Sequence, residues 1–231
     1  IYIEGNSAVL DTQIKKVVQE QISGKYLRVF PMDNIFIYSR KKIKQEILSS
    51  FKRIYYVKIN ALDFTSIAIT VKERRPYALW CGEEVNENKK AINKDCYFID
   101  NKGFLFTKAP TFSGDVYFTV YGDISREGEV EPLGKNFLNE ERFLRLMQLR
   151  ALLSKEGLAT TRLIQRENND FGFYLESGGE FIFNEYQDVE RLLRNLVSGI
   201  DAKKNEGQTV EENLEYIDMR FKNKVLFKFI Q

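Results

Sequence analysis

Hydrophobic and polar residues alternate from Ile67 to Val71. The isoleucines and the valine would face one way and the residues between them the other, which is typical of a half-buried strand. The alternation stops at Glu73–Pro76, and Pro76 lacks the amide hydrogen that a central strand needs. A second apolar run, Tyr77–Trp80, then begins. We therefore predict two domains that meet at a short, stiff joint, with the boundary between residues 74 and 75.

Two helices are predicted before this joint. Apolar residues recur at helical spacing from Leu10 to Ile22, and Gly24 is suited to end that helix. Ser39 is a good N-cap for a second helix, whose apolar stripe continues to Phe51. Short strands are predicted at Ile1–Glu4, Tyr55–Ile59 and Ile67–Val71. The order is strand, helix, helix, strand, strand, and a small sheet with both helices on one face would bury both apolar stripes.

The rest of the chain combines short strands with two more helices. One helix is predicted at Asn139–Glu156, and Gly157 can adopt the conformation that ends it. The second is predicted at Gln187–Ile200, followed by a polar loop from Asp201 to Asn213. The residues expected on the buried side of the first of these helices are Phe143, Leu144, Met147, Ala151 and Leu152.

Nine strands are predicted after the joint, at 77–80, 96–100, 104–107, 116–121, 161–165, 171–176, 180–183, 215–219 and 225–230. Asn101–Gly103 reads as a tight turn that joins the second and third of them in a hairpin, and the last two flank a turn around Lys222 and Asn223. The sequence thus predicts an α+β protein with domains at residues 1–74 and 75–231.

Composition restricts the possible functions. The chain has 231 residues, of which 43% are hydrophobic and 29% charged, which is ordinary for a globular protein. Lys and Arg number 35 and Asp and Glu number 33, so the basic excess of a nucleic-acid-binding protein is absent, although a local basic patch stays open. The many Tyr and Phe residues mostly alternate with polar residues in strands, which favours core packing over stacking on nucleic-acid bases.

The chain contains no histidine, which excludes His-dependent catalysis and His-based metal sites. No recognisable motif marks a pair of carboxylates, so a hydrolase that uses paired acids is not supported. We therefore predict no enzymatic activity, no metal, no cofactor and no small-molecule substrate. No run of about 18 apolar residues is present to span a membrane. Because Ile1 already lies in a strand-like run, we expect this chain to be a fragment of a longer protein.

Three segments resemble the bacterial cell-division protein family FtsQ, called DivIB in Gram-positive bacteria. Val71–Ala78 is similar to that family's Val-x-Glu-Arg-x-Pro-x-Ala junction. Tyr97–Phe106 is similar to its aromatic-Ile-Asp-x-x-Gly-x-x-Phe hairpin, and Tyr216–Phe221, followed by Val225, to its Ile-Asp-Leu-Arg-aromatic ending. The three segments occur in the family's order and at its spacing over nearly the whole chain. The chain departs from the family in the insertion Gly82–Asp95 and in the long Asp201–Asn213 loop.

The resemblance implies a POTRA (polypeptide-transport-associated) domain of βααββ order, followed by the family's β domain. It also implies a cytoplasmic tail and a single transmembrane helix upstream of Ile1, and a location at the division septum outside the cytoplasm. The family has no known catalysis and acts as a scaffold between early and late division proteins, notably the FtsB–FtsL pair (DivIC–FtsL). An alternative is a POTRA-bearing component of a secretion or outer-membrane assembly system, although such proteins usually carry several POTRA units and a membrane barrel.

Two predictions concern sites, a disulfide and a partner-binding strand edge. Cys81 and Cys96 flank a polar loop and border two predicted strands, so we expect a disulfide in an oxidising compartment; two reduced, buried cysteines are the alternative. A chain-terminal strand often lies at a sheet edge, where a partner can add a strand. The residues expected to bind the partner are Tyr216, Arg220 and Phe221, which match the family's ending, with Phe227 and Phe229 added from their position alone.

Other polar residues have both a functional and a structural interpretation. Glu73, Arg74 and Arg75 would form a contact patch at the joint or simply solvate a turn, and the second interpretation is preferred. One interpretation of Asp100 and Gly103 is a catalytic acid beside a flexible loop. The preferred interpretation is that both are ordinary turn residues. Asp218 and Arg220 are two residues apart, and are predicted to form an ion pair or to meet a partner.

Overall fold

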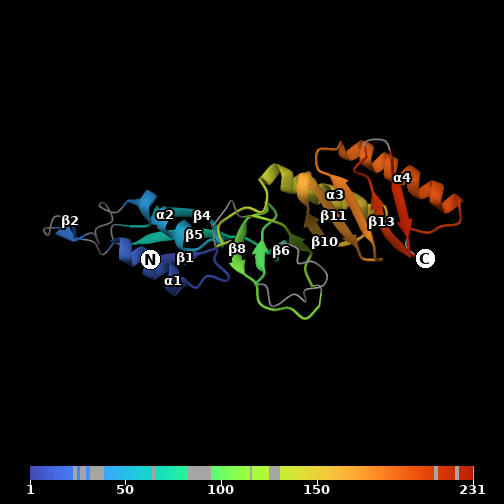
Figure 1. Ribbon diagram of the computed structural model, residues 1–231. Coiled ribbons are helices and arrows are strands. Elements are labelled where there is room, and N and C mark those ends of the chain that lie inside the picture. Colours follow the sequence, from blue (N-terminus) through green and yellow to red (C-terminus); the bar gives the residue numbers. More distant parts are fainter. Residues whose placement is uncertain are drawn as a thin grey trace. The chain divides into compact units, whose positions relative to one another are not determined.

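The chain is an α+β protein that divides into two compact units, Ile1–Arg75 and Pro76–Gln231 (Figure 1). The division falls one residue from the predicted boundary. The computed structural model describes residues 1–22, 25–26, 30–31, 39–63, 66–82, 95–114, 116–124, 131–210, 213–221 and 224–230. The predicted turn at Lys222–Asn223 and most of the Gly82–Asp95 insertion lie outside these residues.

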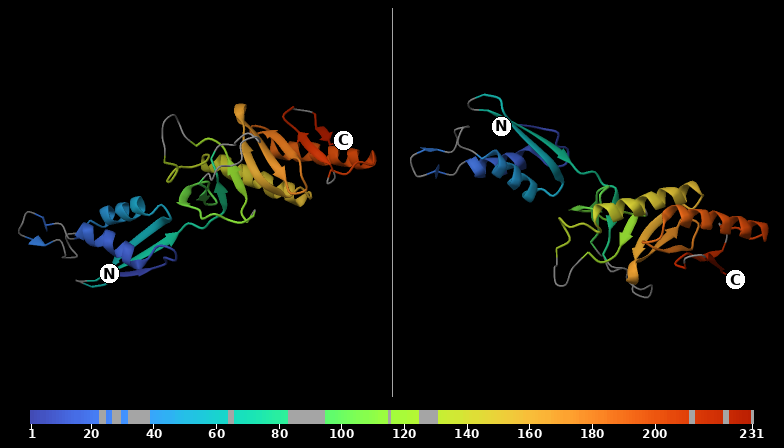
Figure 2. Two further views of the ribbon diagram at one scale, coloured as in Figure 1. Left: turned by 60° about the horizontal axis from the view of Figure 1, so that its bottom comes forward. Right: turned by 90° about the horizontal axis from the view of Figure 1, so that it is seen from above.

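The first unit is a three-stranded sheet with two helices on one face (Figure 2). Its elements are β1 (Tyr2–Glu4), α1 (Asp11–Ile22), α2 (Arg40–Ser50), β4 (Ile54–Ala61) and β5 (Ile67–Glu73). A small ribbon, β2 (Lys25–Tyr26) and β3 (Phe30–Pro31), lies between the two helices, where the sequence predicted neither a helix nor a strand. Strand β5 is central, parallel to β1 and antiparallel to β4.

Alternation and helical spacing explain the core of this unit. The three apolar residues Ile67, Ile69 and Val71 of β5 are buried, as predicted, and so are Ile14 and Val18 of α1 and Ile43 and Ile47 of α2. The Ser39 hydroxyl accepts a hydrogen bond from the Lys42 amide at 3.3 Å and thereby caps α2, as the sequence predicted. Leu10, by contrast, is 61% exposed just before α1 begins.

Glu73 has a structural role that the sequence did not reveal. Its carboxylate accepts hydrogen bonds from the backbone amides of Ser7, Ala8 and Val9, at 2.7 to 3.1 Å, just before α1. Gly5, at φ 85°, turns the chain into this segment where a side chain would clash with the Val71 carbonyl oxygen. Partial burial opposes ionisation of Glu73, but the three amides outweigh it, so its pKa lies below the usual value. Glu73 thus joins the end of β5 to the start of α1.

We expect Glu73→Gln to destabilise the first unit by about 1–2 kcal/mol at pH 7, because amide hydrogen bonds to a charged carboxylate are stronger than those to a neutral amide. The lowered pKa of Glu73 means that its stabilisation is present above the unfolded-state pKa and is lost as the pH falls through the folded-state pKa. The difference between the variant and the parent should therefore narrow as the pH falls below the ordinary glutamate pKa of about 4.3 and close below the lowered folded-state pKa. Amide hydrogen exchange in α1 measures it, with Glu20→Gln on the exposed side of α1 as the control. An equal difference at both ends of the pH range would contradict this role.

The second unit is built on one nine-stranded mixed sheet, in the order β14-β13-β12-β11-β10-β9-β6-β7-β8. Three neighbouring pairs are parallel, β6 with β9, β9 with β10, and β12 with β13. Two helices, α3 and α4, cover the same face of this sheet (Figure 2). The bounds are β6 (Ala78–Trp80), β7 (Tyr97–Ile99), β8 (Leu105–Lys108), β9 (Thr119–Tyr121), α3 (Glu140–Lys155), β10 (Thr160–Gln165), a 3-10 turn (Glu167–Asn169), β11 (Asp170–Leu175), β12 (Glu180–Asn184), α4 (Val189–Asn205), β13 (Leu214–Asp218) and β14 (Leu226–Phe229).

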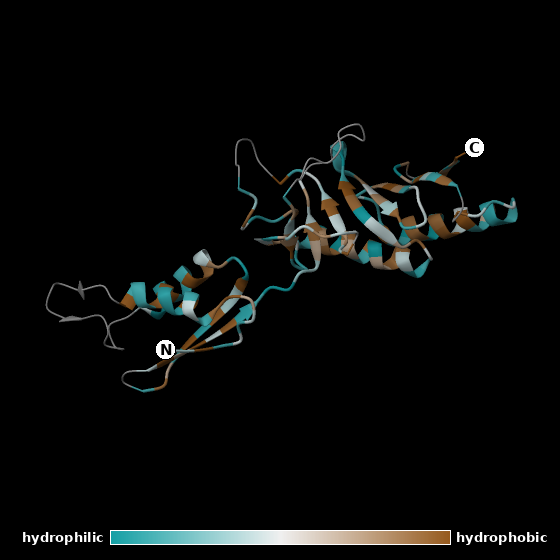
Figure 3. Ribbon diagram, turned by 90° about the horizontal axis from the view of Figure 1, so that it is seen from below, coloured by the Kyte–Doolittle hydropathy of each residue, from teal (hydrophilic) through white to brown (hydrophobic). Residues whose placement is uncertain are grey.

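Phenylalanines from the middle strands form the core beneath the helices. Phe171 and Phe173 of β11 and Phe181 and Phe183 of β12 are almost completely buried. The Phe173 and Phe183 rings stack with centroids 5.4 Å apart. Hydrophobic and hydrophilic colours alternate along these strands and along α4 in Figure 3. The predicted alternation therefore reflects one helix-covered face and one face without a helix.

The phase of α3 differs from the prediction. Phe143 and Met147 are buried, but Leu144 is 46% exposed and Ala151 is exposed as well. Leu146, Leu149 and Leu153 take the inward positions instead. Because apolar residues occur on more than one side of this helix, periodicity alone did not define its buried face.

Two predicted boundaries were also wrong. The strand predicted at 116–121 begins only at Thr119. The helix predicted at 187–200 begins after the Asp188 cap and continues through five residues of the expected loop to Asn205. No Gly or Pro lies between Asp201 and Glu206, and Lys203 and Lys204 interact favourably with the carboxyl end of the helix.

The predicted hairpin after the joint is confirmed, with β7 antiparallel to β8. Asp100 is buried in its turn, and its side chain accepts hydrogen bonds from the amides of Lys102 and Phe104 at 2.9 and 3.0 Å. Gly103 has φ 82° and lies against the Phe143 ring. Asp100 and Gly103 therefore perform turn chemistry, the interpretation that the sequence favoured.

Cys81 and Cys96 form a disulfide in the structure, with their Cα atoms 4.3 Å apart. The bond connects the residue after β6 with the residue before β7, the two strands that pair antiparallel. Cys81 belongs to a small aromatic cluster on the face of the sheet opposite the helices, with Leu79, Phe98 and Phe106. The disulfide closes the Gly82–Asp95 insertion at its base.

Candidate functional site

Strand β14 is an edge of the nine-stranded sheet, and no described strand pairs with its outer side. It is antiparallel to β13, with Ile217 opposite Phe227 and Asp218 opposite Leu226. An extra residue in β13 shifts the register between Leu214 and Tyr216. An unpaired edge strand presents a row of amides and carbonyls to which another extended chain can bond.

The backbone of Phe227 and Phe229 faces this free edge, although their rings do not. The Ile230 amide donates to the Asn213 carbonyl at 2.7 Å, toward the β13 side. Because hydrogen-bonding direction alternates along a strand, Lys228 and Leu226 also turn their backbone groups toward β13, and Phe227 and Phe229 turn theirs outward. The free edge is therefore provided by the main chain of the two phenylalanines.

The rings of Phe227 and Phe229 are half-buried and pack against the main core. They stack with centroids 6.4 Å apart, and Phe227 also contacts α4 at Gly199, where an added Cβ would lie 3.0 Å from the ring. Both rings thus lie on the helix-covered face. A strand added at this edge would meet their backbone and not their aromatic surface.

Asp218, the last residue of β13, forms an ion pair with Arg220, which is one of the two alternatives that the sequence predicted. The Arg220 guanidinium donates to both oxygens of Asp218, at 2.6 to 3.2 Å, and its backbone amide donates at 3.0 Å. A second contact at 3.3 Å joins the guanidinium to Asp170, at the start of β11. Asp218 is 5% exposed, whereas the Arg220 side chain is 41% exposed. The two aspartates therefore hold the guanidinium in place, while part of the arginine side chain stays exposed to solvent.

The electrostatics of this pair favour the charged forms of both groups. Burial alone would raise the pKa of Asp218, but hydrogen bonds from the Arg220 side chain and amide outweigh it, so the pKa is lowered. The pKa of Arg220 is raised, first by its hydrogen bond to Asp218 and also by Asp170, against the effect of burial. At neutral pH a charged guanidinium, paired with two carboxylates, thus lies beside the start of the edge strand.

Phe221 follows directly and is 52% exposed. It lines a hollow of about 200 Å³, including space open to solvent, together with Met219 and the first turns of α4. The side chain of Gln187 anchors this region by donating to the Met219 carbonyl at 2.6 Å. The other residues that line the hollow are Asp188, Arg191, Leu192 and Asn195. Phe221 therefore offers a large aromatic surface beside an amphipathic hollow.

Tyr216 lies on the face of the sheet without helices and is half-buried. In the register it is flanked by Glu180 of β12 and Lys228 of β14. The Lys228 ammonium lies 5.7 Å from the centre of its ring and also contacts Glu215 at 2.7 Å. Tyr216 and Arg220 thus share one face of the sheet. Phe221 instead lies beside the first turns of α4.

Sequence reasoning missed Asp170 and Gln187, which hold Arg220 and Met219 in place. Asp170 is 50 residues away from Arg220 in the chain. No local signal in the sequence connects these residues, because the contact exists only once β11, β12 and β13 are aligned side by side.

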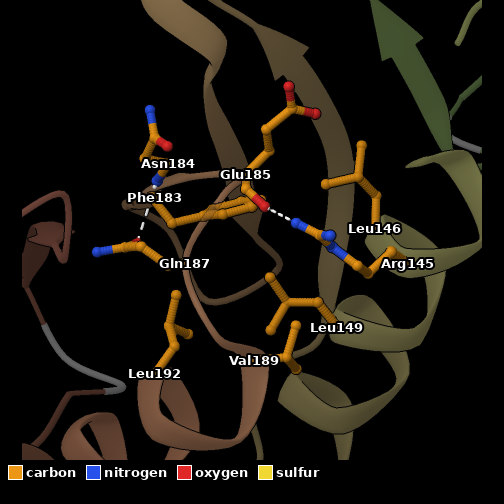
Figure 4. A pocket seen from close by; sticks show the side chains of 9 residues that line it. All are labelled: Arg145, Leu146, Leu149, Phe183, Asn184, Glu185, Gln187, Val189 and Leu192. Atoms are coloured by element: carbon orange, nitrogen blue, oxygen red, sulfur yellow. Dashed lines mark hydrogen bonds between the residues drawn. The ribbon is translucent and has the colours of Figure 1, made fainter.

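A second hollow, of about 230 Å³ including space open to solvent, lies between α3, α4 and the end of β12 (Figure 4). Its polar groups are already bonded. Arg145 donates to the Glu185 carbonyl, the Asn184 amide donates to the Gln187 side chain at 3.2 Å, and Arg142 bonds the buried Glu185 carboxylate at 2.8 Å. The contacts connect α3 to the loop after β12, so this hollow has a structural explanation.

Within the described ranges, no three Cys, Asp or Glu side chains converge in a way that would hold a metal ion. None of the helices in the described part of the chain is long and apolar enough to cross a membrane. No protein-family model matches the sequence, and no curated protein is significantly similar to it.

Proposed function

We propose that this chain is the extracytoplasmic part of a membrane-anchored cell-division scaffold of the FtsQ/DivIB kind. It acts by binding proteins and not by catalysis. The first unit is its POTRA domain and the second its β domain. An upstream transmembrane helix holds it in the cell membrane at the division septum, where it connects early and late division proteins through an FtsB–FtsL-type pair.

The observation that carries the proposal is the open edge of β14, bordered by Arg220 and Phe221. These two residues belong to the segment that resembles the family's ending, and both are exposed at the base of the free edge. Aromatic residues and arginine are the usual anchors of protein interfaces, and a free strand edge supplies main-chain affinity. The structure of the site therefore supplies both components of a strand-addition interface.

Three other features support the proposal. The order β1, α1, α2, β4, β5, with β5 between the other two strands, agrees with the βααββ order of a POTRA domain. The Cys81–Cys96 disulfide is suited to an oxidising extracytoplasmic compartment. Glu73, a member of the first similar segment, connects the final strand of the first unit to its first helix. This contact gives the carboxylate at that position a structural role.

The test is binding of the chain to the extracytoplasmic segments of the FtsB–FtsL pair from the same host, combined with amide hydrogen exchange. We expect a stable complex in which the Phe227 and Phe229 amides gain protection, because an added strand bonds to the outward-facing backbone. The Lys228 amide already faces β13 and serves as the internal reference. Absence of binding would contradict the proposed function. Binding without protection at Phe227 and Phe229 would show that the pair docks elsewhere.

A further inference from the structure

The first unit of this protein carries a net positive charge and the second a net negative charge. Residues 1–75 contain 14 Lys and Arg against 7 Asp and Glu, a formal charge of +7. The remaining residues contain 21 Lys and Arg against 26 Asp and Glu, a formal charge of −5. The nearly neutral total of the chain therefore conceals two oppositely charged units, and charge asymmetry of this size bears on binding partners and not on the fold.

A cluster of cations occupies the beginning of α2. Arg40, Lys41, Lys42 and Lys44 are all exposed, and none of them forms an ion pair with a described residue. The first turn of α2 contains no acidic residue. Positive charges near the amino end of a helix oppose its dipole, so this arrangement costs helix stability. Charges that oppose the helix dipole without a compensating contact are expected where a surface has a function.

The topology places this cluster at the end of the unit where β1 begins. The Ile54 amide bonds to Phe51 directly after α2, so α2 and β4 run in opposite directions. Strand β4 is antiparallel to β5, and β5 is parallel to β1, so Arg40 lies at the end where Tyr2 pairs with Ala68 (Figure 1). The joint to the second unit leaves from the opposite end of β5. Glu20 and Asp63 lie toward the same end as Arg40, which still leaves an excess of positive charge.

We propose that this basic end of the first unit, formed by Arg40, Lys41, Lys42 and Lys44, binds the surface of a bilayer that contains anionic lipids. The inference rests on the proposed function, because that function brings the chain into this end from a transmembrane helix. Cations close to an anionic membrane are attracted to it within a Debye length, and the attraction of neighbouring cations accumulates. Contact at this end orients the first unit on the membrane and places the far end of β5, where the joint begins, away from it.

The test measures cosedimentation of the chain with phosphatidylcholine vesicles that contain about one third phosphatidylglycerol, and with vesicles of phosphatidylcholine alone. We expect binding only to the anionic vesicles, and release at high salt because screening shortens the Debye length to about 3 Å at 1 M. Replacement of Arg40, Lys41 and Lys44 by Glu should weaken binding at least about tenfold. The helix should not be destabilised, because Arg40 and Lys41 lie in its first turn, where acidic residues favour its dipole. Circular dichroism checks this, and the corresponding Gln variant replaces the Glu variant if the latter does not fold.

The matched control replaces Lys155, Arg194 and Lys204 by Glu, on exposed helix positions of the second unit. Circular dichroism checks its fold as well, because Lys155 and Lys204 favour the carboxyl ends of their helices. It changes the net charge of the chain by the same amount and should retain binding. Equal loss in both variants, or no binding of the parent chain, would overturn the proposal. Binding to soluble polyphosphate without binding to anionic vesicles would overturn it in favour of an anionic polymer. The proposed function is tested by a different experiment, the binding of the FtsB–FtsL pair at the β14 edge. Its failure can therefore be distinguished from a failure to bind vesicles.

Discussion

Replacing Phe221 by Ala together with Arg220→Gln and Asp218→Asn should weaken binding of the FtsB–FtsL pair at least about 100-fold, since truncation of each interface anchor typically costs 2 kcal/mol or more. The variant lacks the exposed ring of Phe221 and the guanidinium of Arg220, which lies beside the start of the edge strand. Changing Arg220 alone to Glu is a poorer test. It would place a third carboxylate beside Asp218 and Asp170, and an uncompensated buried charge is strongly destabilising. The neutral Asn–Gln pair keeps the shapes and removes both charges.

The control for this triple variant is Leu144→Ala. Leu144 is 46% exposed on α3, comparable to the 52% of Phe221, but it lies outside the β14 edge. Binding is measured by calorimetry after circular dichroism has shown that both variants are folded. Undiminished binding of the folded triple variant would exclude the β14 edge as the docking surface. The disulfide-closed insertion would then be the next candidate.

Replacing Cys81 and Cys96 by Ala should lower the stability of the second unit by about 3 kcal/mol, the chain-entropy value for a loop of this length. The sequence separation of the two cysteines is 15 residues. For a unit of this size the loss corresponds to a fall in Tm of about 6–12 °C. Alanine is preferred to serine because Cys81 is 5% exposed, and a buried hydroxyl without a partner would add its own cost.

Thermal unfolding is followed by the fluorescence of Trp80, the single tryptophan of the chain. Trp80 directly precedes Cys81, and its indole nitrogen donates to the Gly122 carbonyl at 2.9 Å. Its fluorescence therefore reports on the strand that the disulfide connects. Reduction of the parent chain should produce the same fall in Tm, and the double Ala variant should not respond to the reductant. Two free thiols in the unreduced parent, detected by mass spectrometry, would refute the bond.

The sequence determined the features of this protein that depend on local periodicity and turn chemistry. Alternation in Ile67–Val71 identified the central strand of the first unit, Ser39 identified the start of α2, and Asn101–Gly103 identified the hairpin turn. Pro76 marked the place where one strand had to end before the next could begin. Such features are encoded within a few residues, because side-chain direction, capping and positive φ are properties of the local backbone.

Only the tertiary structure decided which of several equivalent local choices was used. The leucine-rich α3 offers apolar residues on more than one side, and packing on the phenylalanine core placed Leu146 inward and Leu144 outward. Phe227 and Phe229 would serve equally well as exposed anchors or as core residues by position alone. Their contact with the core and with Gly199 of α4 turned the rings inward and left the backbone at the edge. The Asp170–Arg220 contact joins segments far apart in the chain, and such contacts depend on the alignment of strands that no short segment encodes.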